Sequence, residues 1–147
     1  MASSVPATEA GRPLVVGPPV KPWRDRLATG LMLLAALGAV GAAIGAIGAV
    51  ADAGPATRLV ETWRLFGFVM FAGLFVLLAL WPRQERGVWE LAIFHKLALT
   101  ISALAWLSGD TEDAGAVIVS DGTLTVLLLA SYALTRGWTA WRPTSGA

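Results

Sequence analysis

The chain has 147 residues, of which 56% are hydrophobic and 14% are charged, and its net charge is +1 at neutral pH. A domain of this size cannot bury so much apolar surface in a water-soluble core, so the composition indicates a membrane protein. No nucleic-acid partner is expected, because the net charge is small and the basic residues are spread over several membrane flanks. Cysteine is absent, which excludes disulfides, thiolate catalysis and iron–sulfur ligation, and one histidine is too few for a bis-histidine haem site within one subunit. No cofactor is therefore expected.

The first 22 residues contain five of the eight prolines and show no helical period of apolar residues. This composition predicts a disordered cytoplasmic tail. The segment does not resemble a signal peptide, because it lacks a cationic start and the first long apolar run begins only at Leu27.

Four apolar runs follow, at residues 27–51, 59–81, 88–107 and 114–134. A helix needs about 20 residues to cross a bilayer core, so each run is long enough to span it, and the joints are too short for a soluble domain. The sequence predicts an all-α integral membrane four-helix bundle with short loops, occupying residues 23–138. Residues 139–147 are predicted to form a cytoplasmic C-terminal tail.

The distribution of basic residues predicts the orientation. With the N-terminal tail in the cytoplasm, eight Lys and Arg residues lie on the inner side and one, Arg58, lies on the outer side. Both termini are therefore predicted to be cytoplasmic, in the cell membrane. Five of the seven tryptophans support the helix ends, because they fall where an indole can sit among lipid head groups: Trp23, Trp81, Trp89, Trp106 and Trp138.

The first run carries a stripe of glycines. Gly38, Gly41, Gly45 and Gly48 recur at spacings of three, four and three, and Asp52 continues the stripe. Such a bare helix face lets another helix approach closely. We expect packing inside the bundle, and the alternative is a contact with a second subunit.

Ionisable residues inside the runs are the main functional signal, because they are costly in a bilayer. Arg64 lies roughly 7 to 8 Å below the outer end of the second run, and Asp121 lies roughly 10 Å below the outer end of the fourth. Glu61 is one turn above Arg64, and Asp52 lies near the top of the first run. These four residues are predicted to form a polar cluster in the outer half of the bundle.

Two interpretations of this cluster remain open. In the first, Arg64 and Asp121 form a structural ion pair that fixes the helix order. In the second, Asp121 or Glu61 is a proton donor or ion ligand in a site open to the outer face. Ser120, Thr123 and Thr125 lie near Asp121 in the sequence and can hydrogen-bond to it in either case.

The third run contains His95 and Lys96. A neutral imidazole can transfer protons near physiological pH, so His95 is a third candidate catalytic residue. Lys96 lies about 12 Å deep and is expected to extend its ammonium toward the head groups. The two side chains point about 100° apart, which predicts that they do not converge on one small site.

No metal site is predicted. The acidic segment Asp110, Glu112, Asp113 lacks the spacing of a calcium loop and is expected to be a solvated outer turn. The architecture resembles that of many small four-helix bacterial membrane proteins, which belong to unrelated families, and no family motif accompanies it.

Three functions are compatible with these features. The leading hypothesis is a non-catalytic accessory or assembly subunit with a membrane protein partner or a second copy of itself. The alternative is an acid–base cyclase or isomerase embedded in the membrane and acting on a lipophilic molecule such as an isoprenoid or polyketide, through Asp121, Glu61 or His95. The third is a small oligomeric transporter or channel.

Overall fold

The computed structural model describes residues 20–109, 111 and 113–141, and the fold is all-α as predicted. Its elements are α1 (Pro22–Asp52), α2 (Arg58–Leu80), α3 (Val88–Trp106), α4 (Ala114–Thr135) and a short 3₁₀ helix, η1 (Gly137–Trp141). Each of the four α-helices is long and apolar enough to cross a membrane, and the chain is a multi-pass membrane protein. The predicted disordered tail lies outside the described residues up to position 19. The predicted C-terminal tail begins inside η1, and its residues 142–147 also lie outside the described part.

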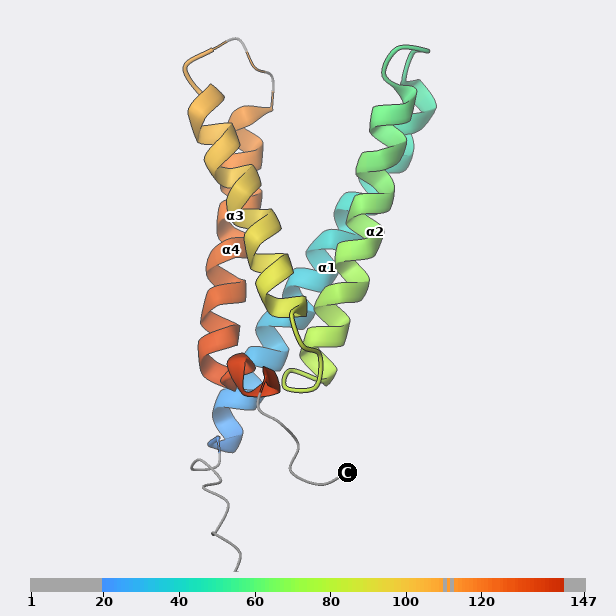
Figure 1. Ribbon diagram of the computed structural model, residues 1–147. Helices are drawn as coiled ribbons and strands as arrows, with labels where there is room; N and C mark the ends of the chain where they lie inside the picture. The colour runs from blue at the N-terminus through green and yellow to red at the C-terminus, as the bar shows by residue number, and fades with distance from the viewer. Residues whose placement is uncertain (1–19, 110, 112, 142–147) are drawn as a thin grey trace, which may run out of the picture.

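The helices form a V of two antiparallel pairs (Figure 1). One arm is α1 packed along α2, and the other is α3 packed along α4. The arms meet where α1 begins and α2 ends, an end we call the vertex, and they diverge toward the joints 53–57 and 107–113, which we call the tips. Contacts between the arms are mainly those of α1 with α4, and α2 touches α3 only slightly.

The hydrophobic core lies in the vertex half of the V. All four helices contribute to it, and its aromatic members are Phe71 and Phe75 of α2 and Trp89 of α3. Small residues of α1 allow α2 and α4 to approach, because an alanine leaves room for a larger partner. The buried members of this core are Met32, Ala35, Ala36, Ala39, Phe71, Ala72, Phe75, Leu78, Ala79, Trp89, Ala92 and Leu128.

Local sequence explains where the helices begin. Helix α1 starts at Pro22, five residues before the predicted Leu27, because proline suits the first helical turn, where its missing N–H is not needed. Asp25 adds an acidic side chain to that turn, which the helix dipole favours. Before α3, Gly87 adopts a left-handed φ of 78°, a conformation that glycine reaches without strain.

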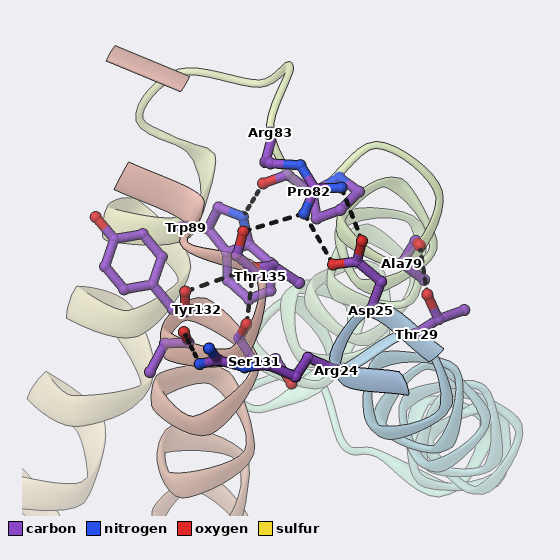
Figure 2. Close-up of polar contacts among 11 residues, drawn as sticks. Arg24, Asp25, Thr29, Ala79, Pro82, Arg83, Trp89, Ser131, Tyr132 and Thr135 are labelled. Carbon is purple, nitrogen blue, oxygen red and sulfur yellow. Dashed lines mark hydrogen bonds and ion pairs between the residues drawn. The ribbon is translucent and has the colours of Figure 1, made fainter. Parts of the chain in front are cut away.

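A polar clasp of Arg83, Asp25 and Thr135 closes the vertex (Figure 2). The Arg83 guanidinium donates to both carboxylate oxygens of Asp25, at 2.8 and 3.0 Å, and to the carbonyl oxygen of Thr135 at 3.1 Å. Its hydrogen bond to Asp25 raises the pKa of Arg83. The clasp joins α1, the 81–87 joint and α4, so one arginine connects both arms.

Replacing Arg83 with lysine should weaken this clasp, since a lysine ammonium cannot form two parallel hydrogen bonds to one carboxylate. We expect a loss of about 1 kcal/mol in the free energy of unfolding, because the pair is partly exposed. Chemical unfolding in mixed micelles at low and high salt measures it. The difference between the wild-type protein and the Arg83→Lys variant should shrink at high salt, and a difference that is independent of salt would contradict the electrostatic explanation.

Candidate functional site

The most buried charged groups of the spans form an ion pair between the two helices of one arm. Lys96 of α3 donates from Nζ to Asp121 Oδ1 of α4 at 2.6 Å. The two residues are only 5% and 8% exposed. A charge in an apolar interior is stable only if it is paired, so each of these groups depends on the other.

Phe71 of α2 brings the second arm against this pair. Its ring centre lies 4.2 Å from Lys96 Nζ, a distance at which the negative face of the ring attracts the ammonium. The same ring lies 4.7 Å from the imidazole of His95. Lys96 is buried whereas His95 is exposed, as expected for side chains that point about 100° apart, although one phenyl ring contacts both. We call Phe71, His95, Lys96 and Asp121 the Phe71 cluster.

The hydroxyls near Asp121 do not serve its carboxylate. Thr125 donates to the backbone carbonyl of Asp121 at 2.8 Å, and Ser120 donates to the carbonyl of Val117 at 3.4 Å. On the neighbouring helix, Thr100 donates to the carbonyl of Lys96 at 2.8 Å. Each threonine bonds to the residue four positions earlier in its own helix, so the ammonium of Lys96 is the main polar partner of the Asp121 carboxylate.

The predicted ion pair of Arg64 with Asp121 does not form. Arg64 lies 3.5 Å from Glu61 on its own helix and 3.9 Å from Asp113 at the start of α4. The reason is the position of Arg64 on its helix: the α2 residue that reaches the Lys96–Asp121 pair is Phe71, which lies about two helical turns farther from the tip than Arg64. Asp121 instead pairs within its own arm, with Lys96, which was expected to extend toward the head groups.

A groove lies between α1 and α2 near the tips. Its volume is about 310 Å³, and its wall is formed on α1 by small residues and on α2 by Phe68, Glu61 and Arg64. The Arg64 side chain is 48% exposed and that of Glu61 is 18% exposed. The α1 residues that line the groove are Ala42, Gly45, Ala46 and Ala49. Of the predicted outer polar cluster, Glu61 and Arg64 lie together, Asp121 does not join them, and Asp113, which was not predicted, does.

The glycine stripe of α1 is not used for packing inside the chain. A Cβ atom added at Gly38, Gly41, Gly45 or Gly48 would meet nothing within 4 Å. The expectation that this stripe packs inside the bundle is therefore wrong. The other side of α1, which consists mainly of alanines, packs inside the chain. The buried residues of this helix are Ala28, Met32, Ala35, Ala36, Ala39, Ala43 and Ala46.

The remaining predicted residues lie apart from these contacts. Asp52 is exposed at the last position of α1. Of the acidic segment in the second tip joint, Asp110 and Glu112 lie outside the described residues, whereas Asp113 is exposed and faces Arg64. Within residues 20–109, 111 and 113–141, no group of three His, Asp or Glu side chains could hold a metal ion.

The sequence contains a signal for the Lys96–Asp121 pair that the prediction did not use. Helices α3 and α4 are joined by a short tip segment, and short connections make antiparallel neighbours. Counted from that segment, Lys96 lies about 15 Å deep and Asp121 about 10 Å deep, a difference that a lysine stem can span. The match in depth is not evident when the position of Lys96 is counted from the opposite end of its helix.

These contacts divide the polar residues of the spans into a closed cluster and an open groove. The closed cluster places a paired acid and base between helices, and the open groove places a loosely paired acid and base beside an apolar wall. Comparison with protein-family models, with curated proteins and with solved structures gives no match to this chain.

Proposed function

We propose that this chain is a non-catalytic accessory or assembly subunit of the cell membrane, and that the glycine stripe of α1 receives a transmembrane helix of another subunit. The observation that carries the proposal is the orientation of the stripe. Its four glycines have open space where a side chain would stand, although the helix packs tightly on its alanine face. In lipid, where little hydrophobic force acts between helices, such smooth faces drive helix association.

The Phe71 cluster supports this proposal over acid–base catalysis by Asp121. Asp121 is the deepest carboxylate, and Lys96 holds it in a short hydrogen bond that a substrate would have to displace. Glu61 lines the groove near the tips and does not belong to the Phe71 cluster. Catalysis on a lipophilic molecule requires an acid or base within hydrogen-bonding reach of that molecule, and the Asp121 carboxylate is instead occupied by Lys96.

The proposed orientation puts the vertex and both termini on the cytoplasmic side and the tips outside. Arg83 and Arg86 lie in the joint at the vertex, and Arg24 and Arg26 lie in the first turns of α1. The excess of basic residues at this end supports the assignment.

If the stripe binds a partner helix, a substitution in it should disrupt assembly without disrupting folding. Gly41→Leu should leave the fold intact, because open space surrounds this position, and should release the partner helix. Light scattering of protein extracted in mild detergent would measure the change as a fall from the mass of a complex to that of one chain. The wild-type chain is expected to keep the larger mass.

Two variants complete this experiment. Gly73→Leu makes the same exchange on α2, where a side chain also meets nothing, and should keep the complex. Ala39→Leu, on the opposite side of α1 about 160° from Gly41, should disturb folding itself, because it overpacks the core. A wild-type chain that is monomeric in mild detergent, or a complex that survives Gly41→Leu, would contradict the proposal.

A further inference from the structure

The groove between α1 and α2 is a second surface, which adjoins the glycine stripe and shares Gly45 with it. Its wall is mostly apolar, and its volume of about 310 Å³ lies at the lower end of the range of ligand pockets. Small side chains on α1 keep it open, and the ring of Phe68 lines it on α2. A groove of this kind accommodates a hydrocarbon chain along its α1 side, where the lining residues are small and apolar.

The charges beside the groove define what the ligand carries. Arg64 stands between two carboxylates, 3.5 Å from Glu61 Oε2 and 3.9 Å from Asp113 Oδ2. Both distances are too long for hydrogen bonds, so the guanidinium keeps donors available for an anion. With one cation and two anions, this group has a formal charge of −1.

Glu61 provides the second recognition element. Its carboxylate oxygen Oε2 is buried and accepts no hydrogen bond from the described residues. A buried acceptor without a donor is costly, and a ligand that supplies an N–H donor removes that cost. An ammonium supplies what Arg64 at 3.5 Å does not, because it brings up to three hydrogen-bond donors.

We infer that the groove binds a phospholipid with a primary ammonium head group, phosphatidylethanolamine, with its phosphate at Arg64, its ammonium at Glu61 and one acyl chain along the small residues of α1. In this lipid the phosphate lies nearer the acyl chains than the ammonium does. On α2, likewise, Arg64 lies deeper than Glu61. Depth agrees with this placement. Arg64 lies about 9 Å below the start of α2, and its long stem can reach the phosphate level.

The experiment places the purified full-length chain in nanodiscs with equal amounts of phosphatidylethanolamine and phosphatidylcholine. Native mass spectrometry then measures which lipid stays bound after gentle release. We expect at least about tenfold preference for phosphatidylethanolamine, because a trimethylated ammonium cannot donate the hydrogen bond to Glu61, and such a bond to a charged group is worth about 1.5 to 3 kcal/mol. Equal retention of the two lipids would overturn the inference.

Three variants assign the contacts. Glu61→Gln should remove the preference while a lipid still binds, and Arg64→Gln should reduce binding of both lipids. Ala49→Leu should fill the groove and release the acyl chain, whereas Gly73→Leu, on α2 outside the groove, should bind as the wild type does. A Glu61→Gln protein that keeps the full preference would also overturn the inference.

Two further measurements separate the lipid from other occupants. Free phosphoethanolamine, which has the same head group without chains, should not bind detectably, and binding equal to that of the lipid would show an anion site instead. Gly41→Leu tests the proposed subunit contact and should not change lipid retention. A complex in which a protein subunit occupies the groove and excludes the lipid would contradict the lipid site while leaving the assembly function intact.

Discussion

Replacing Lys96 with methionine should lower the free energy of unfolding by about 3 to 5 kcal/mol. Methionine preserves most of the volume of the lysine stem but leaves the Asp121 carboxylate buried without its partner at 2.6 Å. The Phe71 ring, which now faces the ammonium, offers that carboxylate no compensation. Chemical unfolding in mixed micelles measures the change, and the amount of protein that accumulates in the membrane should fall with it.

A double replacement tests whether the loss comes from the unpaired charge. Lys96→Met combined with Asp121→Leu removes both charges and should recover most of the stability, because a buried ion pair adds little over an apolar pair of similar size. The matched comparison is Arg64→Ala with Asp121→Leu, whose effects should simply add, since these residues do not touch. A double Lys96 and Asp121 variant that is less stable than either single variant would disprove this explanation.

Replacing Trp89 with alanine should have an effect of similar size, about 3 to 5 kcal/mol. This indole is 1% exposed in the vertex half of the core, packs 5.8 Å from the ring of Tyr132, and donates to the carbonyl oxygen of Pro82 at 2.8 Å. The variant would leave a cavity at the point where the two arms join. Its unfolding midpoint in mixed micelles should therefore fall sharply.

Two comparisons separate packing from hydrogen bonding at this position. Trp89→Phe keeps most of the buried area but loses the N–H donor, so it should cost only part of the full amount. Trp106→Ala makes the same truncation at the tip end of α3, where the indole is exposed, and should cost little. If Trp106→Ala is as damaging as Trp89→Ala, the vertex is not the centre of stability.

Hydropathy was sufficient to predict the four helices, because each crossing of a bilayer demands about 20 apolar residues and the polar joints interrupt them. The same reasoning placed the start of α1 too late, since it followed apolar residues and ignored Pro22 as a helix starter. Apolar content does not encode which helices are neighbours, and in a membrane nearly every face is apolar. That is why Arg64 was assigned to Asp121 although Lys96 holds it.

The sequence also did not show that the alanines of α1, and not its glycines, pack inside the chain. Glycine and alanine are both small, so a sequence shows two candidate contact faces and no preference between them. The chain packs its alanine face inward, where Ala35 and Ala39 belong to the core, and leaves the glycines outside. Glycine loses more conformational entropy than alanine when a helix forms. The stability of this chain alone therefore gives no reason for glycines on the outer face.

The divergence of the arms has a consequence for the bilayer itself. Because the helices are gathered at the vertex and separated at the tips, the molecule has the outline of a wedge (Figure 1). With this outline, the molecule is expected to occupy more area in the leaflet that holds the tips than in the other leaflet. The leaflet at the tips must expand to make room for the wider end of the protein. This expansion costs least where the leaflet is convex, because its surface is already expanded there. A protein of this shape is therefore expected to favour regions where the leaflet at its tips is convex.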